Sequence, residues 1–263
     1  MLTTKRMRVS WLIVLGIVGL SGCATVSSPR NPTDPWESYN RTMYKINDTL
    51  DKAVLKPVAR GYKKVVPEIV RTGVNNFFGN LGDVAVTVNN VFQGKFGRAG
   101  SDAGRVLVNS TVGILGFIDV GSKVGLTKHN EDFGQTLGYW GSRPGPYLIL
   151  PFLGPSTVRD GLGSIVDAPL SYWPYVDSIR ARNIIYAIDS VKARAHGLDA
   201  ETVLDEAALD PYAFTRDAYL QRRESLVHDG NPPKKLEDES EDEVELSPSK
   251  APSGNNSQNG KRP

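Results

Sequence analysis

Apolar residues recur at helical spacing through most of the chain. Between Trp36 and Val54 they stand three or four positions apart, which places them on one face of a helix. Lys56-Pro57 is expected to end this helix, because proline lacks the N–H that a helix interior needs. Further helices are expected over residues 67–81, 83–93, 101–118, 132–140, 156–168, 178–195 and 199–226. Strand patterns are few, so we predict an all-α fold.

Polar residues and prolines suggest where the helices begin and end. Asp34, Asp83, Ser101 and Ser156 precede predicted helices, and their side chains are suited to accept hydrogen bonds from the first turn. Pro211 is expected to break the last helix.

Two apolar segments depart from the simple amphipathic pattern. Residues 106–118 are apolar around most of the helix circumference, so this helix is expected either in the protein core or against lipid. Residues 145–155 are apolar around Pro151. Proline disrupts a helix and disfavours a central strand, so we expect an irregular segment that protein or lipid covers.

The N-terminal residues form a signal peptide that ends on the only cysteine of the chain. Basic residues precede an apolar run from Val9 to Leu20, and Leu20-Ser21-Gly22-Cys23 follows. This order favours a lipoprotein signal over the alternative of a buried cysteine. We predict that residues 1–22 are removed, that Cys23 is acylated, and that 23–33 form a tether. Ala24 is not aspartate, which indicates the outer membrane by the usual sorting rule.

Charge and composition exclude several classes of function. Loss of residues 1–22 removes three basic residues and no acidic one, so the net charge falls from +2 to −1. Nucleic-acid binding is therefore not expected. No later apolar run is long enough to span a bilayer, although helices lying in one leaflet stay possible. Residues 34–228 form the expected helical domain, and 229–263 an acidic, polar, disordered tail.

Catalytic patterns are weak. Ser156, His129 and Asp160 are the residue types of a hydrolase triad, but the chain has no Gly-x-Ser-x-Gly motif. Residues 129–132 carry potential metal ligands that adjacent positions rarely bring to one ion. We predict that the protein is not an enzyme and has no cofactor and no metal site.

Six asparagines interrupt the apolar runs and allow two interpretations. They either form a buried hydrogen-bond network or line a hydrophilic passage. They are Asn75, Asn76, Asn80, Asn89, Asn90 and Asn109.

Several segments, in order along the chain, resemble the MlaA/VacJ family of outer-membrane lipoproteins. The segments are DPWESYNRTMY at 34–44, VNNFFGNL at 74–81, VNN at 88–90, NSTVG at 109–113, EDFGQTLG at 131–138, GPY through PSTVRD at 145–160, and DPY at 210–212. The resemblance implies a mostly helical ring lying in the inner, periplasmic leaflet of the outer membrane, with a central amphipathic channel.

The same resemblance implies a function and its partners. Members of the family remove misplaced phospholipid from the outer leaflet, pass it to a soluble periplasmic carrier, and associate with trimeric porins. Cys23 matches the lipid attachment site. The apolar hairpin beside the channel, which we expect to gate it, matches Tyr147, Leu148, Ile149, Leu150, Pro151, Phe152, Leu153 and Gly154. The alternative is an adaptor that organises porins or envelope proteins without moving lipid.

Overall fold

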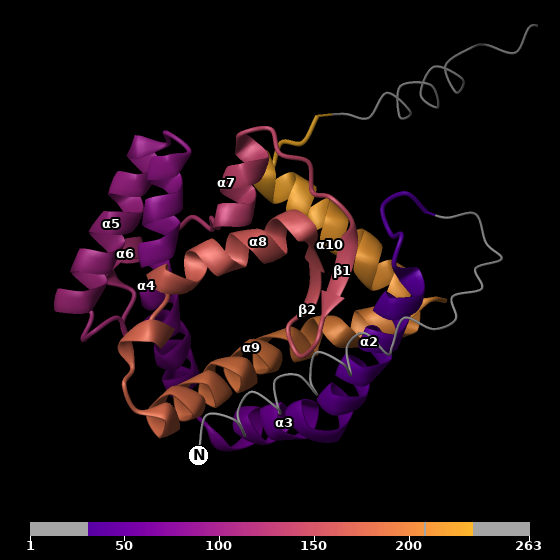
Figure 1. Ribbon diagram of the computed structural model, residues 1–263. Coiled ribbons are helices and arrows are strands. Elements are labelled where there is room, and N and C mark those ends of the chain that lie inside the picture. The colour runs from indigo at the N-terminus through magenta and orange to yellow at the C-terminus, as the bar shows by residue number, and fades with distance from the viewer. Residues whose placement is uncertain (1–30, 208, 234–263) are drawn as a thin grey trace, which may run out of the picture.

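The computed structural model describes residues 31–207 and 209–233. The predicted signal peptide, Cys23, most of the tether and the tail from residue 234 lie outside these ranges. The described protein is mostly helical, with one small sheet (Figure 1), which confirms the predicted class. Its elements are α2 (Glu37–Leu50), the π-helical turn η1 (Asp51–Leu55), α3 (Lys56–Val65), α4 (Glu68–Phe92), α5 (Phe96–Thr111), α6 (Val120–Lys123), α7 (Phe133–Tyr139), β1 (Tyr147–Leu150), β2 (Gly154–Thr157), α8 (Val158–Asp167), the 3-10 turns η2 (Ala168–Leu170) and η3 (Trp173–Tyr175), α9 (Ile179–Ala207) and α10 (Pro211–Val227).

The first helix does not end at Lys56-Pro57, as the sequence suggested. The π-helical turn η1 joins α2 to α3, and the N–H of Lys56 donates to the carbonyl of Asp51. Pro57 sits in the first turn of α3. There its missing N–H is tolerated, and the wider π turn makes room for its ring.

Helix α4 replaces two predicted helices. Asp83 does not cap a new helix; it lies buried within α4 and forms ion pairs with Lys128 and Arg105. Helix α5 likewise begins five residues before Ser101, whose hydroxyl donates instead to the Thr127 carbonyl. Both polar side chains found tertiary partners that local sequence does not reveal.

The apolar helix predicted over 101–118 ends early. Helix α5 stops at Thr111, and the chain then turns through Ile114 and Leu115, both at positive φ (53° and 56°). Gly113 permits this turn, because a Cβ there would lie 2.2 Å from the carbonyl oxygen of Ile118.

The segment expected to be irregular is a β-hairpin. Strands β1 and β2 are antiparallel, with Tyr147 opposite Thr157 and Leu150 opposite Gly154. Pro151 falls in the turn between them, and Pro155 lies in a strand that pairs on one side only. Proline is tolerated at both kinds of position. The expectation of an irregular segment was therefore wrong, whereas the hairpin that the family resemblance implied is present.

The later helices agree better with the sequence. Helix α7 lies where a helix was expected, and α10 begins at Pro211, with the Asp210 side chain accepting from two backbone N–H groups. Thr157, not Ser156, caps α8. Helix α9 continues unbroken to Ala207, through the break expected near residue 197.

The elements are arranged around an opening in the ribbon. Helix α8 borders it above, α9 below, α4 on one side and the hairpin on the other (Figure 1). Helix α5 packs on α4, and α3 packs on α9. Among the described residues no helix combines the length and apolar character needed to cross a membrane.

Burial in this fold favours polar side chains. Eight apolar residues are buried among those described, against sixteen polar or charged ones, while many large apolar side chains are exposed. A water-soluble domain shows the opposite balance in its core, so the exposed apolar surface calls for another partner.

Candidate functional site

The hairpin is attached to α2 through two asparagines. Asn40 is fully buried; its amide donates to the carbonyl of Tyr147 (3.1 Å) and its oxygen accepts from the N–H of Ile149 (2.8 Å). Asn40 therefore supplies the bonds that a neighbouring strand would give to β1.

Asn47 repeats this arrangement nearer the hairpin tip. It donates to the carbonyl of Leu150 (3.0 Å) and accepts from the N–H of Phe152 (2.9 Å). Seven residues, or two helical turns, separate the two asparagines, so both face β1. This pair was not predicted, although the sequence carries a signal for it: two asparagines seven residues apart on one predicted helix.

A small core lies beneath the base of the hairpin. Tyr147 and Ile149 are buried with Tyr212 of α10. The Tyr212 hydroxyl donates to the buried carboxylate of Asp34, which also accepts from Asn40 (2.8 Å). Burial and the Asp34 carboxylate raise the pKa of Tyr212 above its usual value. Asp34 was expected to cap the first helix; it is instead an acceptor in this core.

The predicted gating segment divides into a buried base and an exposed tip. Phe152 and Leu153 at the tip are 78% and 69% exposed, while Tyr147 and Ile149 are almost completely buried. Exposing two such side chains costs about 1.5–3 kcal/mol each. The exposed tip is therefore the part of this segment that can move at the smallest cost in buried apolar surface.

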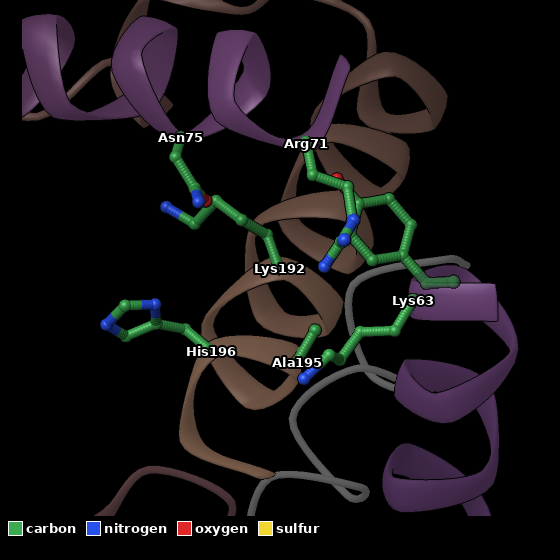
Figure 2. A pocket seen from close by; sticks show the side chains of 7 residues that line it. Lys63, Arg71, Asn75, Lys192, Ala195 and His196 are labelled. Atoms are coloured by element: carbon green, nitrogen blue, oxygen red, sulfur yellow. The ribbon is translucent and has the colours of Figure 1, made fainter. Parts of the chain in front are cut away.

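A cavity of about 570 Å³ lies between α4, the loop after η2 and α9. One wall is apolar, with Phe78, Leu81 and Leu170 among its residues. A smaller cavity of about 90 Å³ adjoins it; the two share Asn75, Lys192 and His196. Figure 2 shows Arg71 and Asn75 reaching from α4 toward α9 in the smaller cavity. Asn75 was a candidate from the sequence, but the basic residues here were not, because they come from separate helices.

The six asparagines fall into two groups. Asn75 is exposed in both cavities, and Asn76 donates to the carbonyl of Phe117. Asn80 and Asn109 are buried but border, with these two, a third polar cavity of about 90 Å³.

Asn89 and Asn90 belong to a buried network. Asn89 donates to Asp167 (2.8 Å) and accepts from Thr136, and Asn90 donates to Asp102 (3.0 Å). Both are fully buried, so they match the network interpretation and we do not propose them as lining residues. Burial raises the pKa of the Asp167 carboxyl against the lowering effect of its hydrogen bonds.

The three residue types of a hydrolase each have other partners. The ring of His129 contacts Asp102 (3.0 Å), and Asp160 binds Arg223 (2.8 Å) and the hydroxyl of Tyr219 (2.8 Å). The hydroxyl of Ser156 donates to the adjacent Thr157 carbonyl. Within the described ranges, no group of three or more potential metal ligands converges.

Relatives match this chain along most of its length. It is 36% identical over 227 residues to the intermembrane phospholipid transport system lipoprotein MlaA of Escherichia coli (strain K12), covering 83% of this chain and 88% of that protein. It is 33% identical over 225 residues to the protein of that name from Haemophilus influenzae, covering 82% and 89%.

A solved structure and a family model agree with these relatives. The structure, from work on the "Structural basis for maintenance of bacterial outer membrane lipid asymmetry", matches with a TM-score of 0.66 at 33% identity, over 74% of this chain and 98% of that one. The family model described as "MlaA lipoprotein" matches residues 32–226. The chain belongs to the MlaA lipoprotein family.

Proposed function

We propose that this protein transports phospholipid between the membranes of a Gram-negative envelope. It removes misplaced phospholipid from the outer leaflet of the outer membrane and passes it to a soluble periplasmic carrier, which maintains lipid asymmetry. The observation that carries the proposal is the cavity between α4 and α9, with an apolar wall beside a cationic end, in a chain of the MlaA family. Such a cavity suits an amphipathic ligand.

Seating in the inner leaflet of the outer membrane accounts for the unusual surface. Exposed apolar side chains occur on α3, α4, α5, the turn after α5, the hairpin tip and α8; examples are Val65, Ile69, Leu107, Leu115, Phe152 and Ile165. Lipid acyl chains cover such side chains and keep them away from water. In this proposal acylated Cys23 fixes the orientation, and the apolar surface adds to the attachment.

The transport is passive, because a channel without an energy source only equilibrates its two sides. Direction then comes from partners, which we propose to be trimeric porins and the periplasmic carrier. No covalent chemistry is proposed, since Ser156, His129 and Asp160 are engaged elsewhere. The hairpin tip, held by Asn47 and exposed at Phe152, is the proposed gate.

Deletion and restoration of the gene test the function. We expect the deletion strain to show more phospholipid accessible to a membrane-impermeant reagent at the cell surface, together with detergent sensitivity. Plasmid-borne wild-type protein should reverse both, and an empty plasmid should not. Unchanged surface phospholipid in the deletion strain would contradict transport.

The alternatives have distinct outcomes in the same strains. Altered porin assembly with normal surface phospholipid would favour the adaptor. Fatty acid released from phospholipid by purified protein, and lost in Ser156→Ala, would favour a hydrolase.

A further inference from the structure

The two adjoining cavities between α4 and α9 differ in character. The larger has aromatic and aliphatic residues on its wall, including Phe78, Leu81, Ala85 and Leu170. The smaller is bordered by Tyr62 and Lys63 of α3, Arg71 of α4 and Ala195 of α9. Because they share Asn75, Lys192 and His196, one molecule is able to occupy both.

Positive charge gathers in the smaller cavity. Arg71, Lys192 and Lys63 approach it from three different helices (Figure 2). Of the described side chains that line the two cavities, only Asp189, in the larger one, is a carboxylate; it pairs with Lys192 (2.6 Å) and accepts from the Tyr172 hydroxyl (3.2 Å). Among the described lining residues, cationic side chains therefore outnumber carboxylates.

Arg71 has unused donors. Its Nε donates to the carbonyl of Val66 (3.1 Å), which fixes the direction of the guanidinium. Among the described residues no carboxylate lies within ion-pair distance of Arg71. Its two terminal nitrogens are therefore available to an anion, and a guanidinium recognises phosphate through two parallel hydrogen bonds.

A buried hydroxyl in the same cavity also lacks a partner. The Tyr62 oxygen is inaccessible to solvent and makes no hydrogen bond within the described part of the chain. Buried polar atoms of this kind are normally satisfied. Tyr62 lines the smaller cavity, so a small rotation of its side chain would bring the hydroxyl to an anion beside Arg71. The Asn75 amide and the His196 ring border the same space.

We propose that Arg71 and Lys192, with Tyr62, hold the phosphate of a glycerophospholipid while its acyl chain lies along Phe78 in the larger cavity. This rests on the proposed function and names where its substrate binds. Lys192 joins the two halves, since it lines both cavities and its ammonium lies 4.8 Å from the centre of the Phe78 ring. Asp189 neutralises Lys192 in part, so the lipid is held weakly enough to be released, as transport requires.

Binding to the full-length protein in detergent tests the site. The probes are a phosphatidylglycerol and a diacylglycerol that carry the same fluorescent acyl chain, and the variants are Arg71→Gln, Lys192→Gln and the double substitution. We expect the double variant to bind phosphatidylglycerol at least about tenfold more weakly, because charge-assisted hydrogen bonds to the phosphate are lost. Diacylglycerol binding should change by less than about twofold, since it uses only the apolar wall.

Controls separate this site from general effects of charge or folding. Lys45→Gln removes the same charge at an exposed position on α2 and should bind both probes like wild type. Arg71→Lys keeps the positive charge but loses the two parallel N–H donors of the guanidinium, so its affinity should fall between those of wild type and Arg71→Gln. Circular dichroism of each variant checks that it is folded.

Three results would overturn the site. The first is wild-type phosphatidylglycerol affinity in the double variant. The second is an equal loss for both probes, which would indicate damage to the apolar cavity. The third is displacement of the lipid by micromolar inorganic phosphate, which would mean that the site takes free phosphate. Suppose that the variants bind phosphatidylglycerol normally and that the wild-type gene restores lipid asymmetry in the deletion strain: the proposed binding site is then wrong, and the transport function stands. If the wild-type gene does not restore lipid asymmetry, the transport function fails, and the binding assay still tests the site independently.

Discussion

The polar and charged side chains at the two ends of α4 differ in burial and in pairing. Toward its middle and C-terminal end, Asp83 is buried with Arg105, and Asn90 with Asp102, in a network shared with α5. Near its N-terminal end, Arg71 and Asn75 face the cavities beside α9. The first set is closed to solvent and mostly paired; the second is open and keeps spare donors.

The difference separates polar side chains that hold the helices together from polar side chains that are free to contact a ligand. In the proposed position among lipid chains, the protein would gain little from burying apolar side chains, because lipid covers them as well as protein does. Its helices are then held together by hydrogen bonds and ion pairs, as between α4 and α5. Polar groups left open at a cavity have no such structural role, so they are the better candidates for ligand contact.

Removing Arg105, the cation in the buried network between α4 and α5, should have the largest effect on stability. Arg105 is 2% exposed and binds Asp119 (3.0 Å) and Ser122 (2.8 Å). Arg105→Met leaves Asp119 and Asp83 with reduced compensation, so we expect a loss of about 3–5 kcal/mol in the free energy of unfolding. Urea unfolding in detergent, followed by circular dichroism, measures it.

Arg98→Met is the matched control. Arg98 pairs with Asp229 but is 37% exposed, and a partly exposed pair contributes about 0–1 kcal/mol. Equal stability of the two variants would show that the polar interior between α4 and α5 does not hold the helices together.

The two hairpin asparagines should separate stability from gating. Asn40→Ala leaves the buried N–H of Ile149 unpaired, so we expect a loss of about 2–3 kcal/mol. Asn47→Ala frees the exposed tip and should cost about 1 kcal/mol or less while changing the rate of phospholipid transfer to a periplasmic carrier. Unfolding and transfer assays on both variants check this. An Asn47→Ala protein with wild-type transfer would remove the tip from the gating mechanism.

Lowering the pH should reduce the stability of the buried network between α4 and α5, and this is the smallest of the expected effects. Burial disfavours ionised Asp119, but hydrogen bonds from Ser122 and Arg105 outweigh it and lower the pKa of Asp119 to about 2. A carboxyl with a lowered pKa stabilises the folded state above its unfolded value near 4, and this contribution is lost as the pH falls toward 2. The stability difference between wild type and Asp119→Asn should therefore be larger at pH 7 than at pH 3. A difference that does not change with pH would contradict the assignment.

Local sequence was a good guide where local interactions decide the structure. The apolar spacing from Trp36 onward, the short helix after Asp132 and the break at Pro211 were all confirmed. It failed where a polar residue had two possible partners. Asp34, Asp83 and Ser101 were expected to cap helices, yet each binds a residue distant in sequence.

The candidate site shows the same division. The sequence left a buried network and a hydrophilic passage open for all six asparagines. In the structure Asn75 borders the cavities, whereas Asn89 and Asn90 lie in the network. No spacing in the sequence distinguishes these asparagines, because each interrupts an apolar run in the same way. Arg71 and Lys192 are 121 positions apart and were not predicted at all.

The sequence alone determined the helical class and the resemblance to a lipid-transport family, and it predicts a lipoprotein signal ending at Cys23, because each depends on neighbouring residues or on ordered motifs. Only the tertiary structure decided which polar residues are buried partners and which are open to a ligand. The physical reason is that a side chain's role here depends on the charge and solvent access around it, and those are set by helices far apart in the chain.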